Sequence, residues 1–319
     1  MTIPRRAVLA GALTLTSALT ATACSSGTPN SPSKDGSSHL VKTAMGDVRV
    51  KDHPERVVVL DTAELDSAIT LGVRPVGAAH ADAGSGFLDY LPKDKVAGIK
   101  DVGAVMSPSL ESIAALKPDL ILTSKVRHGD KYAELSKIAP TVMTESTGYP
   151  WKQNFQLHAL ALGKVAEAKQ VTDEYGARVR ELTARLGGPA KAAALKVNVV
   201  RFVEGADIRI YGRKNYIATV LADVGLGRPA VVDKAKDGFS YDVSPERIDL
   251  ADADVIFHAT YGDPAKSKAT QTLGSALWKG MSAVRAGRVH AVDDQLWIQG
   301  IGYGAATTIL RELGEMLPR

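Results

Sequence analysis

The stretch RVVVLDTAELDSAITLGVRPVGAA, residues 56–79, decides the fold. It opens with a continuous apolar run that ends at Asp61, which is typical of a strand buried on both faces. Apolar residues then recur with helical spacing, and a second short strand, VRPVGAA, closes the stretch. A buried strand, a helix and another buried strand predict a unit of a mostly parallel sheet with helices on both faces.

The same pattern continues along the chain and restarts after residue 190. The further runs that predict strands are DLILTS (119–124), TVMTES (141–146), KVNVVRFV (196–203), DIRIYG (207–212), ADVIFHA (253–259) and RVHAVD (288–293). Helical stretches separate most of them, which is typical of an α/β protein. We therefore expect two α/β lobes of the Rossmann-like type with mostly parallel sheets, over residues 41–150 and 188–319.

A connecting helix is expected between the two lobes, over residues 151–187. The segment has apolar residues at helical spacing and no proline inside, and Gly-Gly-Pro at 187–189 stops it. At about 1.5 Å per residue, a helix of this length spans roughly 45 to 50 Å, more than one lobe needs. One long, rigid α-helix that joins the lobes is the simplest interpretation, and it predicts a closure of only a few degrees.

The first 23 residues are expected to be a secretory signal, because two arginines precede an uncharged apolar run and small residues. A membrane-anchor helix is the competing interpretation, but Thr and Ser interrupt the run. Export by either the general or the twin-arginine route fits. Cys24, the only cysteine, resembles the lipidated cysteine of bacterial lipoproteins. Residues 24–40, rich in Ser, Gly and Pro, then predict a lipidated start and a flexible tether.

Composition and motifs argue against several classes of function. The formal net charge is only +4, of which two charges lie in the signal, so a nucleic-acid surface is not expected. The motifs of nucleophile elbows, phosphate-binding loops and dinucleotide-binding loops are absent from the sequence, so an enzyme is not expected. The seven histidines are scattered without paired spacing, so no direct metal site is expected.

Several motifs together resemble one family: the helix-linked bacterial substrate-binding proteins that deliver iron–siderophores, haem or cobalamin to ABC importers. The resemblance covers nearly the whole chain after the tether. It rests on PERVVVLD (54–61), ELDSAITLGVRPVGAA (64–79), PSLESIAALKPDLIL (108–122), LWKGMSAVRAGRVHAVD (277–293) and WIQGIGYGAATTILREL (297–313). The segment 199–229 is similar to the siderophore branch of Gram-positive bacteria. The resemblance implies a monomeric extracytoplasmic receptor, anchored by lipid to the outer face of the cytoplasmic membrane.

A short phrase occurs twice, as SPSLESIAALKPDLIL (107–122) and VSPERIDLADADVIF (243–257). In each copy a serine that is a natural N-cap stands two residues before a glutamate, Glu111 or Glu246. Acidic residues are favoured in a first helical turn in any case. The resemblance implies a further role, in which each glutamate docks one lobe onto one subunit of an ABC importer permease dimer.

Basic residues that follow predicted strands are candidates for the ligand cleft. They are Arg127, Arg201 and Arg213, with Lys125 and Arg209 as further possibilities. The resemblance places Arg201 facing the cleft. A guanidinium group suits a ferric chelate, because the iron-bound oxygens carry partial negative charge and accept forked hydrogen bonds. An ordinary solvated surface position is the alternative for each arginine.

Aromatic residues are scarce, at 5% of the chain, so their positions are informative. Trp151, Phe239, Tyr241 and Trp297 lie in segments expected to border the cleft, where flat apolar faces suit an organic siderophore backbone. Packing in the core is the alternative for each. The expected ligand is a ferric siderophore that carries its own iron, with no cofactor. A hydroxamate such as ferrioxamine is favoured, and haem or cobalamin is the alternative.

Overall fold

The computed structural model describes residues 37–81 and 86–318. The expected signal, Cys24 and most of the expected tether lie outside the described residues. The described chain begins with an antiparallel pair of strands, β1 (Ser38–Thr43) and β2 (Gly46–Lys51). The expectation that the tether reaches residue 40 was therefore wrong at its end, because the last three tether positions already pair in a sheet. None of the described helices is both long and apolar enough to cross a membrane.

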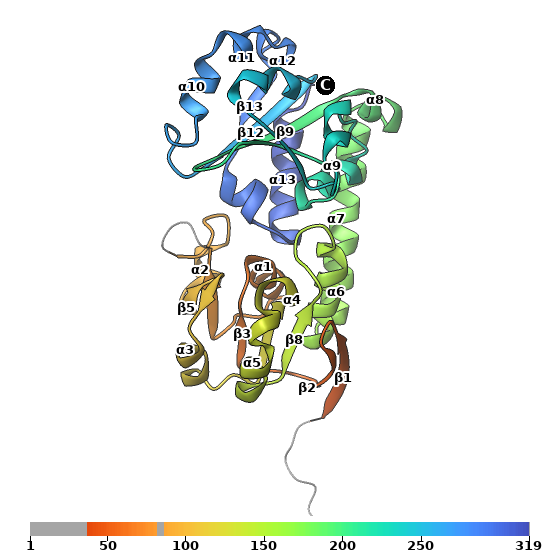
Figure 1. Ribbon diagram of the computed structural model, residues 1–319. Helices are drawn as coiled ribbons and strands as arrows, with labels where there is room; N and C mark the ends of the chain where they lie inside the picture. The colour runs from red at the N-terminus through yellow and green to blue at the C-terminus, as the bar shows by residue number, and fades with distance from the viewer. Residues whose placement is uncertain (1–36, 82–85, 319) are drawn as a thin grey trace, which may run out of the picture. The chain divides into compact units, whose positions relative to one another are not determined.

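The first lobe is built on a six-stranded sheet (Figure 1). Its strand order is β6-β5-β4-β3-β7-β8, and every neighbouring pair is parallel except β5 with β6. The strands are β3 (Val57–Val59), β4 (Gly77–His80), β5 (Lys100–Ala104), β6 (Ser107–Pro108), β7 (Leu120–Ser124) and β8 (Thr141–Thr144). The helices are α1 (Thr62–Thr70), α2 (Lys93–Val96), α3 (Leu110–Ala115), α4 (Lys125–His128), η1 (Gly129–Lys131) and α5 (Tyr132–Ile138).

Side chains of this sheet enter two separate hydrophobic clusters. Val57 and Val59 of β3 belong to one cluster, whereas Val58 and Leu60 belong to the other. All four are buried, since successive side chains of a strand point to opposite faces and helices cover both faces. The expectation of a doubly covered parallel sheet is therefore confirmed for this lobe.

The second lobe is built on a five-stranded sheet of order β11-β10-β9-β12-β13. β9, β12 and β13 are parallel, whereas β10 and β11 continue the sheet as antiparallel strands. The strands are β9 (Val197–Val203), β10 (Ile208–Tyr211), β11 (Ser240–Val243), β12 (Val255–Tyr261) and β13 (Val289–Ala291). The helices are α8 (Pro189–Ala194), α9 (Tyr216–Val224), η2 (Ala230–Lys234), η3 (Pro245–Ala251), α10 (Ala269–Gly274), α11 (Ala276–Gly280), α12 (Ser282–Arg285), η4 (Gln295–Gln299) and α13 (Tyr303–Met316).

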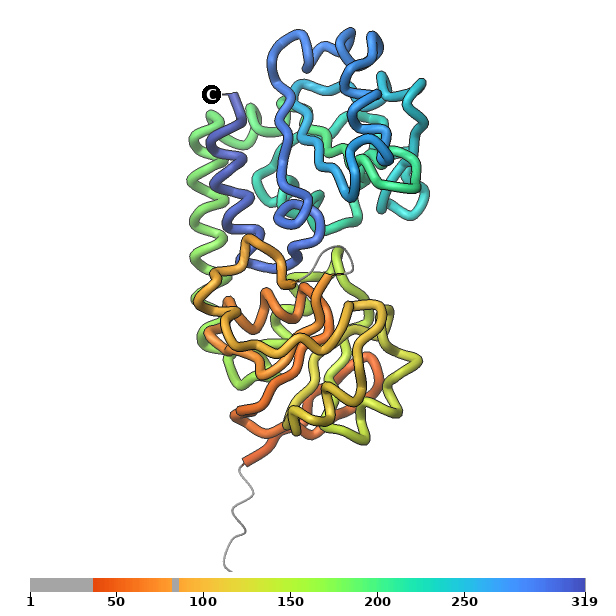
Figure 2. Tube along the Cα trace, turned by 90° about the vertical axis from the view of Figure 1, so that its left-hand side faces the viewer, coloured from red at the N-terminus to blue at the C-terminus, as the bar shows by residue number. Residues whose placement is uncertain are grey.

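The expected single helix over residues 151–187 is divided into α6 (Trp151–Ala161) and α7 (Val165–Arg185). The break falls at Gly163, whose φ of +67° is left-handed. A Cβ atom on Gly163 would lie 2.1 Å from the carbonyl oxygen of Asp52, so the chain needs glycine there. α7, with 21 residues, is the long connecting helix, and α13 runs beside it (Figure 2).

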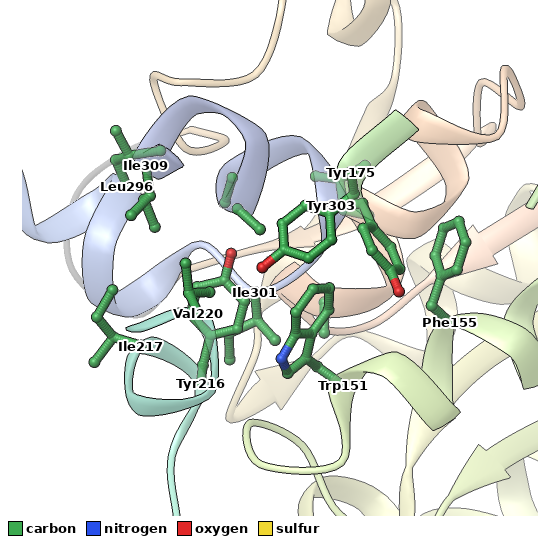
Figure 3. Close-up of a cluster of buried hydrophobic side chains, with 14 of the residues drawn as sticks. Trp151, Phe155, Tyr175, Tyr216, Ile217, Val220, Leu296, Ile301, Tyr303 and Ile309 are labelled. Carbon is green, nitrogen blue, oxygen red and sulfur yellow. The ribbon is translucent and has the colours of Figure 1, made fainter. Parts of the chain in front are cut away.

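Aromatic rings from the connecting helices and from the second lobe meet in one buried cluster (Figure 3). Trp151 packs edge-to-face against Tyr175, Tyr216 and Tyr303, at centroid distances of 6.0, 5.3 and 4.6 Å. Such pairs add about 0.5 to 1.5 kcal/mol each beyond the area that they bury. α13 also packs against α1 of the first lobe, so the C-terminal helix belongs to both lobes.

Candidate functional site

The first half of the site lies where the strand order of the six-stranded sheet reverses. β3 and β7 are neighbours there, and the chain leaves them toward α1 and α4. Asp61 follows β3 and caps α1, because its side chain accepts a hydrogen bond from the backbone N–H of Thr62 at 2.7 Å. Arg127, in α4, donates its Nε–H to Asp61 at 2.9 Å. A reversal of strand order leaves a crevice at the carboxyl ends of the strands, where α/β proteins bind ligands.

Asp61 is buried, with a side-chain exposure of 2%, while Arg127 is 33% exposed. Burial raises the pKa of Asp61, and the nearby Glu64 raises it further. The Arg127 guanidinium opposes both effects, because a cation at hydrogen-bond distance favours the carboxylate. The pair therefore presents the edge of a guanidinium whose orientation is held from behind by a buried acid.

The second half of the site is a bidentate ion pair in the other lobe. Arg201, in β9, donates from Nε and from one terminal nitrogen to the two oxygens of Asp294, both at 2.6 Å. Gln299 donates to the same carboxylate at 2.8 Å, and the guanidinium lies 4.7 Å from the centre of the Tyr261 ring. Burial disfavours the charged form of Arg201, but Asp294 and Tyr211 outweigh it and raise the pKa of Arg201.

Both arginines line one cavity of about 350 Å³. Its wall takes Asp61, Thr62 and Arg127 from the first lobe and Arg201, Tyr211, Lys214 and Phe239 from the second. Segments more than 70 residues apart in the chain thus converge on one space between the lobes. A concave space with a few fixed polar groups among apolar walls is the usual form of a small-molecule site.

The aromatic part of the wall belongs mainly to the second lobe. Tyr211 and Phe239 pack edge-to-face at 5.6 Å, and Phe239 is 41% exposed. Tyr149, from the segment after β8, also lines the cavity and is exposed. Trp297 backs the wall rather than facing the space openly, because it is fully buried and donates its Nε1–H to Glu312 at 2.6 Å. The cavity therefore offers flat apolar faces beside its two guanidinium groups.

Of the residues predicted to contact ligand, four line the cavity: Arg127, Arg201, Phe239 and Trp297. The structure does not bring the other three there. Trp151 is 2% exposed and lies in the aromatic cluster of Figure 3, where its Nε1–H donates to Thr219 at 2.6 Å. Arg213 forms an exposed ion pair with Asp233 at 2.6 Å, outside the cavity wall. Its neighbours Tyr211 and Lys214 do line the cavity, but the Arg213 guanidinium is held by both oxygens of Asp233 instead.

Tyr241 is the third residue outside the cavity wall, and the Lys234 ammonium lies 5.4 Å from its ring centre. Strand alternation explains this, since Tyr241 packs against the cluster on the far face of β11. Lys125 pairs with Glu145 at 3.0 Å and does not line the cavity. The sequence interpretation missed Asp61, Tyr149, Tyr211, Lys214, Tyr261 and Asp294; the position of the two acids after strands was the available signal.

Glu111 and Glu246 are both exposed, at the starts of α3 and η3. Ser109 caps α3 as predicted, accepting from the backbone N–H of Ser112 at 3.2 Å. Ser244 does not cap its helix in that way. Its side chain instead forms a hydrogen bond with Glu246, which lowers the pKa of Glu246. The two similar segments, 107–122 and 243–257, therefore differ in local geometry, while each presents a carboxylate at the surface.

Among residues 37–81 and 86–318, no group of three or more His, Cys, Asp or Glu side chains is arranged to hold a metal ion. Three of the histidines have clear partners within the protein. His39 and His80 each pair with an aspartate, at 2.9 and 2.8 Å. His128 is fully buried between the Thr123 hydroxyl and the Val105 carbonyl oxygen, both at 2.7 Å.

Comparison of the sequence with known proteins finds a matching family and several similar proteins. The model of the periplasmic binding protein family matches residues 57–296. A probable siderophore-binding lipoprotein of Bacillus subtilis is 39% identical over 91% of this chain and 92% of its own length. An Fe(3+)-citrate-binding protein of Bacillus subtilis is 29% identical over 90% of this chain and 88% of its own.

Solved structures agree with these relatives. Staphylococcus aureus SirA in complex with staphyloferrin B has a TM-score of 0.78 and 33% identity, covering 87% of this chain and 98% of that one. Bacillus subtilis FeuA, a triscatecholate siderophore-binding protein in complex with ferri-bacillibactin, has a TM-score of 0.73 and 25% identity, covering 87% and 97%. The matched family consists of binding proteins, so this chain is not an enzyme. The chain therefore belongs to the periplasmic binding protein family.

Proposed function

We propose that the protein is an extracytoplasmic, lipid-anchored receptor that binds a ferric siderophore between its lobes and delivers it to an ABC importer. The observation that carries the proposal is the cavity in which Arg127 and Arg201, one from each lobe, face the same space. Two guanidinium groups suit the iron-bound oxygens of a chelate, which accept hydrogen bonds and carry partial negative charge. The exposed ring of Phe239 suits the organic backbone of the chelate.

The named relatives support an iron chelate over other ligands. The two relatives named above are described as binding siderophores or ferric citrate, and the two structural neighbours above hold siderophores. Haem and cobalamin, the alternatives from the sequence, have no counterpart among these names. A hydroxamate such as ferrioxamine remains our prediction for the chemical type of the chelate.

Delivery to an importer is proposed through Glu111 and Glu246. Each is exposed at the start of a short helix, and each belongs to a different lobe. Two separated carboxylates on two lobes match a partner made of two equivalent permease subunits. We infer that the receptor acts as a monomer and that a lipid on Cys24 holds it at the outer face of the cytoplasmic membrane. Relatives named as lipoproteins support the anchor.

A fluorescence titration tests the proposal. Trp297 backs the cavity, so a bound ferric chelate will quench tryptophan emission. The purified protein is titrated with ferrioxamine B, a ferric triscatecholate, ferric citrate, haem and cobalamin in parallel. Saturable quenching by at least one ferric chelate, and none by haem or cobalamin beyond free tryptophan controls, is expected. Saturable quenching by haem or cobalamin alone would overturn the proposal.

A further inference from the structure

Each arginine of the cavity is already paired with a carboxylate from its own lobe. Arg127 pairs with Asp61 at 2.9 Å, and Arg201 forms two 2.6 Å hydrogen bonds with Asp294. Both acids are buried, with side-chain exposures of 2% and 8%. Such shielding from water matters, because charges in a buried site are screened far less than charges at the surface.

The charges at the cavity are therefore close to balanced. The charged residues of the wall are Asp61, Arg127, Arg201 and Lys214. Asp294 lies directly behind Arg201 and accepts a further hydrogen bond from Gln299. Three cations thus stand against two carboxylates, each of which accepts hydrogen bonds from a guanidinium.

We propose that Asp61 and Asp294 are specificity determinants that restrict the cleft to ferric chelates of low net charge, an inference that rests on the proposed function. A neutral or singly charged chelate gains the directed hydrogen bonds of the guanidinium groups without strong repulsion from the carboxylates. A trianionic chelate, such as an iron triscatecholate, gains from the cations but is repelled by both acids. Rejection of a wrong ligand by a placed like charge is a common source of specificity.

The alternative role for the two acids is positioning alone. A carboxylate that only fixes the rotamer of its arginine would strengthen the binding of every chelate by a similar factor. Its removal would then weaken binding of neutral and trianionic chelates alike. Selectivity between chelates of different charge therefore separates the two roles, whereas the affinity for any single chelate does not.

The test compares Asp294→Asn and Asp61→Asn with the wild-type full-length protein. Each variant keeps the shape of the side chain and removes one negative charge, and the two lie in different lobes, so one remains informative if the other does not fold. Asp233→Asn is the matched control, because Asp233 also accepts a two-point contact from an arginine, Arg213, but lies outside the cavity wall. Dissociation constants are measured by calorimetry for ferrioxamine B, ferrichrome and a ferric triscatecholate.

The wild type is expected to prefer ferrioxamine B or ferrichrome. Each cavity variant is expected to lower the ratio of the triscatecholate dissociation constant to that of ferrichrome by about tenfold or more. Asp233→Asn leaves the ratio within about twofold. An equal loss for all chelates in a folded variant, or a wild type that binds the triscatecholate as tightly as ferrichrome, would overturn the inference but leave the proposed function standing. Binding of none of the three chelates would overturn the inference, and the proposed function fails as well only if the fluorescence titration also finds no binding of ferric citrate.

Discussion

Asp66 joins the two lobes through a set of buried hydrogen bonds, and its replacement by Asn gives a sharp prediction. The side chain lies in α1 of the first lobe and is fully buried. One carboxylate oxygen accepts from the backbone N–H of Gly304 at 3.0 Å, and the other from that of Ala305 at 3.0 Å. Thr70 and Tyr90 each donate a hydroxyl to it as well, at 3.2 and 2.8 Å. A first-lobe carboxylate thus covers the N-terminus of α13.

The cost of Asp66→Asn follows from this geometry. An amide has one oxygen, so one of the two buried backbone N–H groups must face an NH₂ group and stay unsatisfied, at about 2 kcal/mol. The negative charge at the positive end of α13 is also lost, at about 1 kcal/mol. Burial raises the pKa of Asp66, because it disfavours the carboxylate. The stabilisation of α13 by this charge is therefore already partly offset in the wild type. The expected loss is therefore up to about 3 kcal/mol.

Thermal unfolding followed by circular dichroism measures the effect. For a domain of this size, each 1 kcal/mol lowers the melting temperature by roughly 2 to 4 °C, so the upper limit of about 3 kcal/mol for Asp66→Asn corresponds to a fall of about 6 to 12 °C. Tyr90→Phe is the matched control, because it removes a single hydroxyl donor and leaves both backbone contacts in place. It should cost about 1 kcal/mol. If the two variants melt within about 2 °C of each other, the carboxylate does not hold α13 as reasoned here.

Three further predictions concern docking, the cavity and acid stability. Charge reversal of both Glu111 and Glu246 to Lys should abolish uptake of the ferric chelate by cells and leave its affinity unchanged; normal transport would contradict the docking role. Arg201→Ala should weaken chelate binding at least about tenfold in calorimetry, whereas Arg213→Ala, outside the cavity, should change it less than about twofold. Burial lowers the pKa of His128 below its usual 6.5, so the unfolded chain takes the proton first and stability falls as pH drops through 6.5. The melting temperature of His128→Gln should fall less between pH 7 and pH 5 than that of the wild type; an equal fall would refute this.

Most of the fold followed from local patterns, but the division of the connecting helix was not predicted. Runs such as VVVL at 57–60 predict buried strands because every side chain in them is apolar, and both faces of that strand are covered. The break between α6 and α7 was missed, although Gly163 stands at it. Gly163 ends α6 in the left-handed conformation typical of a helix C-terminus, with the Lys164 N–H donating to the Ala159 carbonyl oxygen, so a local stop signal was present and was not used. Only the close approach of the Asp52 carbonyl oxygen, more than 100 residues earlier, is reported by no local pattern.

The candidate site was predictable only in part, for a similar reason. Arg127 and Arg201 could be named because basic residues near the carboxyl ends of strands of an α/β sheet tend to reach the crevice. Trp151 was expected at the cleft, but rings from Tyr216 and Tyr303 enclose it, and both lie far away in the sequence. Which carboxylate pairs with which arginine likewise depends on how the strands are ordered in each sheet.

The most direct test of the central claim is the position of the iron. Crystals of the protein grown with ferrioxamine B, and with the ferric chelate that binds tightest in the titration, are measured at the iron absorption edge. We predict one anomalous peak in the cavity between Arg127 and Arg201, with chelate density against Phe239. An iron peak elsewhere on the protein, with this cavity empty of chelate, would contradict the account.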